Sequence, residues 1–216
     1  MQESTSREKV LKKIRAALIS KSANPDPRLD FDKSIFRMND DVPELIFASN
    51  FRNSGGQFVF CTDIYELAES LLTLAQLKRW QGLVVPEATL ADFLEQCEFP
   101  VNRDHTAVGP GKPAVTLCES LIARTGSILV SSGQTAGRAL PVAGPAHIVV
   151  AFTEQIVDDM KDALALMRTR YGDKQPSSMT FITGPSRTAD IGNELVFGAL
   201  GPSELYVFLI DKPVGW

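Results

Sequence analysis

Between residues 57 and 210 the chain alternates short apolar runs with longer stretches in which apolar side chains recur every three or four positions. Short apolar runs are typical of buried strands, and the longer spacing is typical of helices with one buried face. The runs predict strands at residues 57–61, 83–85, 114–117, 127–131, 147–152, 178–183 and 204–210. The amphipathic stretches predict helices at residues 63–79, 87–95, 154–170 and 186–197.

This alternation predicts an α/β domain with a largely parallel sheet and helices on both of its faces. In open sheets of this kind, ligands usually bind beyond the carboxyl ends of the strands. The loops after residues 85, 117, 131, 152 and 183 are therefore the expected place for a functional site.

The first forty residues follow a different pattern. They predict an amphipathic helix over residues 6–20, with an apolar face formed by Val10, Leu11, Ile14, Ala17 and Leu18. We expect this helix to pack on its own domain or on a sister subunit, because its apolar face has no aromatic membrane anchors. Prolines then end the helix, and a polar stretch follows to about residue 41. The predicted parts are an N-terminal helix with a linker arm, 1–40, and an α/β domain, 41–216.

Composition narrows the class of protein. A chain of 216 residues with 44% hydrophobic and 22% charged residues is close to the average soluble globular protein. The net charge of -4 gives no general reason to bind nucleic acid or an acidic membrane. No uninterrupted apolar stretch is long enough to span a membrane, and the charged first 21 residues do not resemble a secretory signal. We therefore expect a cytoplasmic protein.

Metal and redox chemistry have few ligands to use. The chain contains three cysteines, Cys61, Cys97 and Cys118, which are far apart and form no C-x-x-C pair. His105 and His147 are its two histidines. We therefore expect no metal or other cofactor to be bound by this chain. His147 opens an apolar run, which favours a hydrogen-bonded structural histidine over a general base.

The turn at residues 183–190 is the first candidate ligand site. It follows a predicted strand and begins a predicted helix. Its candidate ligand-binding residues are Gly184, Ser186, Arg187, Thr188 and Asp190. Free N–H groups and the positive end of the helix dipole would favour an anion there. The alternative is structural, with Ser186 as a helix cap, Asp190 complementing the dipole and Arg187 as a surface charge.

Two further segments hold candidate residues. Arg124, Thr125 and Gly126 form either the edge of an anion site or a plain turn between two strands. Arg138 lies in a loop rich in glycine and proline that comes before the apolar run at 147–152. Glu119 is a weak catalytic candidate, because pairing with an arginine is favoured over a role as acid, base or nucleophile.

The order of these motifs resembles a known family. The stretches at residues 119–127, 137–140, 145–150 and 182–191, the last reading Ile-Thr-Gly-Pro-Ser-Arg-Thr-Ala-Asp-Ile, are similar to the LUD domain in its LutC branch. The similarity covers about residues 114–211. This chain has Arg-Thr-Gly-Ser at residues 124–127, where the family typically has Glu-Thr-Gly-Thr, and Gly192 where the family often has glutamate.

The resemblance implies a NagB/RpiA/CoA-transferase-like α/β fold. It also implies a component without a cluster of its own that acts with iron–sulfur partner proteins in the bacterial oxidation of L-lactate to pyruvate. Such a component would bind a small carboxylate or phosphate, or a partner, at the carboxyl edge of the strands.

Two other readings stay open. The first is a stand-alone enzyme acting on a sugar phosphate or an acyl-CoA, with Glu119 as its reactive group. The second is a scaffold that binds cluster-containing partners and no ligand. A homo-oligomer is compatible with each of them.

Overall fold

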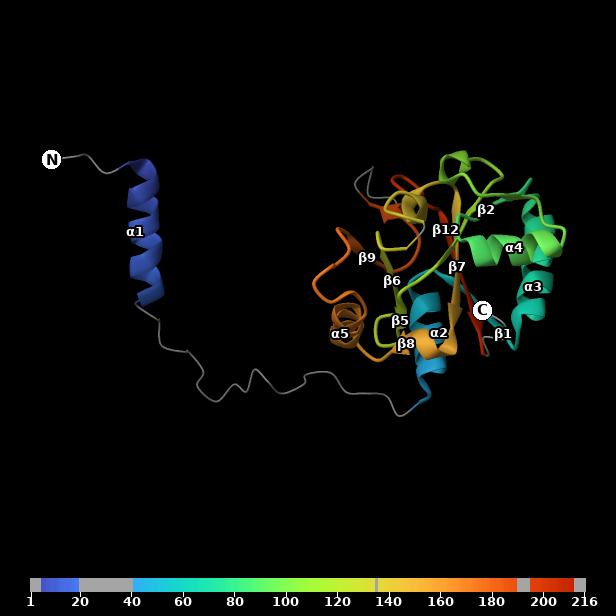
Figure 1. Ribbon diagram of the computed structural model, residues 1–216, viewed down its shortest axis with the longest axis horizontal. Coiled ribbons are helices and arrows are strands. Elements are labelled where there is room, and N and C mark those ends of the chain that lie inside the picture. The colour runs from blue at the N-terminus through green and yellow to red at the C-terminus, as the bar shows by residue number, and fades with distance from the viewer. Residues whose placement is uncertain (1–4, 20–40, 135, 190–194, 212–216) are drawn as a thin grey trace. The chain divides into compact units, whose positions relative to one another are not determined.

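The computed structural model of the protein describes residues 5–19, 41–134, 136–189 and 195–211 (Figure 1). The chain divides into two compact units, residues 1–38 and 39–216. The described part of the first unit is helix α1 (Ser6–Ile19), which confirms the predicted helix, whereas the predicted linker arm lies outside the described residues. Among the described helices, none is long and apolar enough to cross a membrane.

Helix α1 is fixed at its start by its own sequence. The backbone N–H of Thr5 donates to Oε2 of Glu8 at 2.9 Å, and the backbone N–H of Glu8 approaches Oγ1 of Thr5 at 3.4 Å. This reciprocal pair is a capping box, which satisfies N–H groups that the first helical turn leaves free. Along the helix, Val10, Leu11 and Ile14 are 45% to 56% exposed.

The second unit is built on a six-stranded sheet in which every pair of neighbours is parallel. In spatial order its strands are β1 (Gln57–Cys61), β12 (Glu204–Ile210), β7 (Ala146–Phe152), β4 (Ala114–Leu117), β2 (Leu83–Val84) and β3 (Val101–Asn102). The predicted parallel α/β fold is therefore confirmed. Strand β7 is buried along its whole length and β12 is buried after its first residue, because both faces of the sheet are covered.

Alternate residues of the central strands enter two separate cores. Ile148 and Val150 of β7 pack on the side of helices α3 (Ile64–Lys78) and α4 (Ala88–Gln96). Val149 and Ala151 face the opposite core, which contains helix α2 (Pro43–Asn53) and a second sheet. Figure 1 shows α3 and α4 on one side of the parallel sheet and the second sheet on the other. Because successive side chains of a strand point to opposite faces of the sheet, one strand contributes to both cores.

The second sheet has four strands in the order β8 (Ile156–Val157), β5 (Ser120–Ile122), β6 (Ser127–Ser131) and β9 (Met179–Ile182). Strand β6 runs antiparallel to both β5 and β9. Its Ile128 and Val130 join the core shared with the parallel sheet, while Leu129 packs against helix α5 (Met160–Tyr171). The loops after residues 131 and 183 therefore belong to this sheet and not to the parallel one, contrary to expectation.

The predicted helix at 154–170 begins later than expected. Residues 153–157 form a short 3-10 turn, η3 (Thr153–Gln155), followed by β8, and α5 starts only at Met160. The cause is local, because the side chain of Asp159 accepts the backbone N–H of Met160 at 2.5 Å. The N–H of Asp159 in turn donates to Oδ2 of Asp162 at 3.1 Å, which completes a capping box.

The predicted helix at 186–197 is wrong for the residues that the structure describes. Strand β10 (Arg187–Thr188) pairs antiparallel with β11 (Val196–Phe197), and residues 190–194, including Asp190, lie outside the described part of the chain. The backbone is turned away from a helix by Gly184 and Gly198, which have φ angles of +82° and +77°. An apolar spacing compatible with a helix was therefore overridden by the turns beside it.

Helix α2 was not predicted. Its sequence signals are Pro43 at the start of the helix and two phenylalanines, Phe47 and Phe51, one turn apart. Both rings are fully buried and stack with their centroids 5.4 Å apart. The described structure also adds the 3-10 turns η1 (His105–Ala107) and η2 (Leu140–Val142).

Candidate functional site

The turn at residues 183–186, called here the signature turn, lies at the amino edge of the parallel sheet. The backbone N–H of Ser186 donates to the carbonyl of Pro202 at 2.8 Å, just before β12 begins. Nearby, the N–H of Ser203 donates to the carbonyl of Pro145, just before β7 begins, at 3.0 Å. The expectation that this turn occupies the carboxyl edge of the parallel strands is therefore wrong.

The glycines of two motifs bring the backbone close to the end of α2. A Cβ atom added at Gly184 would lie 2.1 Å from the carbonyl oxygen of Ser54, and one added at Gly126 would lie 2.3 Å from the backbone nitrogen of Phe51. The side chain of Asn50 then donates to the carbonyls of Ala123 and Arg124 at 2.9 and 3.0 Å. Both glycines thus have a structural requirement that does not involve a ligand.

The predicted anion site at this turn loses its main physical basis. No helix begins at Ser186 among the described residues, so no helix dipole or free first-turn N–H groups are available there. The exposed Arg187 instead directs Nη1 toward the carbonyl of Ser54 at 3.4 Å, beyond the end of α2, where a positive charge is favourable. Thr188 lies in β10 and is half-buried.

The three arginines that the sequence indicated as candidates, Arg124, Arg138 and Arg187, do not come together. Arg124 donates to Oδ1 of Asp159 at 2.7 Å, and this hydrogen bond holds the pKa of the Asp159 carboxyl below its usual range. Arg138 donates to the hydroxyl of Ser177. Since Ser177 precedes β9 and the signature turn follows it, Arg138 and Arg187 lie near opposite ends of that strand. The hydroxyl of Thr125 is buried and without a hydrogen-bond partner among the described residues.

A pocket of about 240 Å³ adjoins the signature turn and is called here the signature pocket. Its wall is formed by β9, the signature turn and the segment at residues 200–202, with Pro141 and Val142 at one side. Within the described residues, no charged side chain lines it. The hydroxyl of Thr183, at its edge, is 2.7 Å from the hydroxyl of Ser127. The pocket is thus suited to an apolar group more than to an anion.

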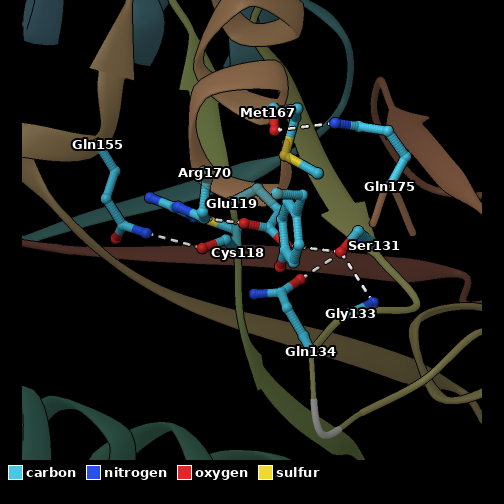
Figure 2. A network of polar contacts seen from close by, with 10 residues as sticks. Cys118, Glu119, Ser131, Gly133, Gln134, Gln155, Met167, Arg170 and Gln175 are labelled. Atoms are coloured by element: carbon cyan, nitrogen blue, oxygen red, sulfur yellow. Dashed lines mark hydrogen bonds and ion pairs between the residues drawn. The ribbon is translucent and has the colours of Figure 1, made fainter. Parts of the chain in front are cut away.

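Glu119 lies close to the carboxyl end of β4 and is 1% exposed. Its Oε1 accepts the hydroxyls of Ser131 at 2.5 Å and Tyr171 at 2.6 Å, and its Oε2 pairs with Arg170 (Figure 2). We call these four residues the Glu119 network. Both carboxylate oxygens are therefore engaged, which is the pairing that the sequence favoured over catalysis.

Local backbone geometry aims Glu119 toward α5. The N–H of Glu119 donates to the carbonyl of Leu129 at 2.8 Å, while Ser120 is the residue paired with Leu129. Two residues opposite one form a β-bulge, which shifts the alternation of side chains and redirects them. Burial, followed by the hydrogen bond to Glu119, raises the pKa of Tyr171 above its ordinary value. The phenol therefore stays protonated and can donate.

Two buried polar groups at the parallel sheet were not foreseen as a pair. His147 is fully buried, and its Nε2 is 2.9 Å from Oγ1 of Thr116 on the neighbouring strand. Burial lowers the pKa of His147 to about 3, so the ring stays neutral, in agreement with a structural histidine. Thr116 occupies an alternate position in the apolar run at 114–117, the sequence signal that could have suggested a cross-strand partner.

Glu87 is a buried acid that the sequence reading missed. It lies three residues after the end of β2, and its side chain is buried, with 7% exposure. Its Oε1 lies 3.5 Å from the backbone nitrogen of Leu117, and its Oε2 has no hydrogen-bond partner among the described residues. Burial raises the pKa of this carboxyl. Its signal in the sequence is an acidic residue two positions after the end of a predicted parallel strand.

Comparison with known proteins supports the resemblance seen in the motifs. Residues 113–210 match the LUD domain family. Lactate utilization protein C of Bacillus licheniformis is 32% identical over 101 residues, which are 45% of this chain and 42% of that protein. The protein of the same name from Bacillus pumilus is 33% identical over 100 residues, with the same two shares. The matched region thus spans less than half the length of these relatives.

A solved structure shares the fold. The crystal structure of a DUF162 family protein from Deinococcus radiodurans, at 1.70 Å resolution, has a TM-score of 0.60 to this chain at 20% sequence identity. The alignment covers 78% of this chain and 96% of that one. Residues 113–210, the segment that matches the LUD domain family, include the signature turn, the Glu119 network, β6, β7, β9 and β12. Over residues 113–210 the chain is therefore similar to the LUD domain family and to the proteins named lactate utilization protein C.

Proposed function

We propose that this chain is a cluster-free, LutC-like component of a bacterial system that oxidises L-lactate to pyruvate. The relatives named lactate utilization protein C support a place in such a system. They match over less than half of their length, so the whole-protein role is carried to this chain as a proposal. We further propose that the chain acts by docking on an iron–sulfur partner protein at the signature pocket.

The observation that carries this proposal is the apolar character of the signature pocket and its rim. Leu200 is 93% exposed and Val142 is 50% exposed. Val142 and Leu200 also line the pocket of about 240 Å³. Exposed apolar groups beside a cavity are typical of surfaces that bind another protein, in which an apolar side chain of the partner fills the cavity.

The test is capture of partners by the full chain from its native bacterium grown on L-lactate. A tagged wild-type chain is expected to retain proteins that carry iron–sulfur clusters, identified by mass spectrometry and by iron and sulfide content. Leu200→Asp is expected to reduce their recovery at least about tenfold, because a charge would be buried at an apolar contact. Leu77→Asp is the matched control, since Leu77 is 77% exposed on α3.

Two outcomes contradict the proposal. The first is a wild-type chain that retains no cluster-containing protein. The second is equal recovery with Leu200→Asp and with wild type, which would remove the signature pocket from the contact. Thermal unfolding of both variants must match wild type, so that a loss of recovery reflects the surface and not the fold.

A further inference from the structure

Arg138 is joined to two serines at the end of the second sheet. It donates to Oγ of Ser177, and Oγ of Ser177 is 3.1 Å from Oγ of Ser132. Ser132 follows directly after β6, and Ser177 lies two residues before β9. These three side chains, which we call the arginine–serine site, come from segments far apart in the sequence and meet beside one sheet end.

The Glu119 network holds one side of this site in place. Oγ of Ser131 donates to Glu119 and accepts the backbone N–H of Gly133 at 3.0 Å, and the N–H of Ser131 donates to the side chain of Gln134 at 3.1 Å (Figure 2). A Cβ added at Gly133 would lie 2.6 Å from the hydroxyl of Tyr171. The turn that carries Ser132 is therefore fixed from several directions, as preorganised binding groups require.

A count of hydrogen atoms shows what the site can still donate. Oγ of Ser132 accepts the backbone N–H of Ser178 at 3.1 Å, and Oγ of Ser177 accepts from Arg138. The contact between the two hydroxyls uses one hydroxyl hydrogen, so the other remains available within the described residues. The guanidinium has five N–H donors, of which the hydrogen bond to Ser177 uses one.

The charge of the site is positive. Arg138 is exposed, and it forms no salt bridge with a carboxylate among the described residues. Nearby, Arg170 is neutralised by Glu119. A single guanidinium with a neighbouring hydroxyl suits one carboxylate, which accepts two parallel N–H bonds from arginine and a third bond from the serine.

We propose that Arg138, Ser132 and Ser177 form a binding site for a small monocarboxylate such as a 2-hydroxy acid. This inference rests on the proposed function, because it names the class of small molecule that the component would recognise. It relocates the anion site from the signature turn to the other end of β9. The Glu119 network serves this site as a support, through Ser131, and does not contact the ligand.

Isothermal titration of the full chain with sodium L-lactate tests the site, with pyruvate and inorganic phosphate as further probes. Wild type is expected to bind L-lactate and pyruvate more tightly than phosphate. Arg138→Ala is expected to weaken L-lactate binding at least about tenfold, since hydrogen bonds to a charged group are lost. Ser177→Ala is expected to weaken it about threefold. Arg187→Ala and Arg52→Ala, which change exposed arginines elsewhere, are expected to bind as wild type does.

Three results overturn the inference. They are no binding of any carboxylate by wild type, equal L-lactate binding by Arg138→Ala and wild type, or phosphate binding that exceeds L-lactate binding. The failure is distinguishable from failure of the proposed function, because partner capture depends on Leu200. Arg138→Ala is expected to retain the partners at the wild-type level even when it no longer binds L-lactate.

Discussion

The signature turn and the Glu119 network both adjoin the four-stranded sheet, but different kinds of interaction hold them in position. The signature turn is positioned by the absence of side chains, since Gly184 and Gly126 let backbone contact backbone at the end of α2. The Glu119 network is positioned by polar side chains that leave no carboxylate oxygen unpaired. A motif that a family shares can therefore reflect packing, and the proposed carboxylate site at Arg138 lies at the other end of β9.

The largest expected loss of stability follows substitution of a glycine that contacts the end of α2. Gly126→Ala is expected to destabilise the protein by about 3 kcal/mol, because its new Cβ would overlap the backbone of Phe51 and its φ of +59° disfavours alanine. Gly137→Ala is the matched control, with a φ of +64° and nothing within 4 Å of the added Cβ. It is expected to lose only about 1 kcal/mol. Urea unfolding measures both, and equal losses would remove the packing role of Gly126.

A smaller effect is expected in the Glu119 network. Glu119→Gln is expected to destabilise the protein by about 2 kcal/mol, because an amide group replaces one of the two acceptors and faces donors. The exposed Glu154→Gln is expected to change stability by less than about 0.5 kcal/mol. The same urea experiment reports both free energies of unfolding. A loss with Glu119→Gln no larger than with Glu154→Gln would show that the network does not hold α5 on its sheet.

The smallest expected effect on stability concerns Glu87, a buried carboxyl that, unlike Glu119, has one oxygen without a hydrogen-bond partner among the described residues. Burial raises the pKa of this carboxyl above its ordinary value, while N–H groups of Leu117 and Ala136 act in the opposite direction. An acid with a raised pKa contributes fully to stability below its unfolded pKa and loses that contribution as pH rises through the folded pKa. The side chain of Glu87→Gln cannot ionise. Between pH 4 and pH 8, the free energy of unfolding of this variant is therefore expected to rise by about 1 kcal/mol relative to that of wild type.

Unfolding free energies of the two proteins across that pH range give the measurement. A difference that is constant with pH, or one that grows as the pH falls, would contradict the stated direction. Glu154→Gln again serves as the control, because an exposed carboxylate gives no comparable trend.

The sequence predicted the longer parallel strands well because burial on both faces leaves a continuous apolar run, as at residues 148–152 of β7 and 205–210 of β12. It also predicted the start of α3, where the side chain of Asp63 accepts the backbone N–H groups of Tyr65 and Glu66 at 2.9 Å. These features depend on neighbouring residues alone. The early start given to α5 and the helix predicted at 186–197 failed because Asp159 and Gly184 impose local geometries that a periodic apolar pattern does not report.

The candidate sites were harder to predict because their partners are distant along the chain. Arg124 pairs with Asp159, Glu119 pairs with Arg170, and Arg138 donates to Ser177, and the partners in each pair are more than 30 residues apart in the sequence. The sequence identified the arginines as charged groups beside turns, and it predicted the functional loops at the carboxyl edge of one parallel sheet. Because β6 and β9 run antiparallel, the loop after β6 lies beside the start of β9, and Arg138 is therefore separated from Arg187, which follows the end of β9.

The pairing of β1 with β12 has a consequence for the order in which the molecule assembles. Gln57 lies opposite Tyr206, so the parallel sheet cannot complete this edge until nearly all of the described chain has left the ribosome. Contacts between residues so far apart are slow to form, because a long loop must close first. Until then β1 offers Phe58, Val59 and Phe60 to any other strand that meets it. Nascent chains of this protein are therefore expected to depend on chaperones that shield the first strand until the last one arrives.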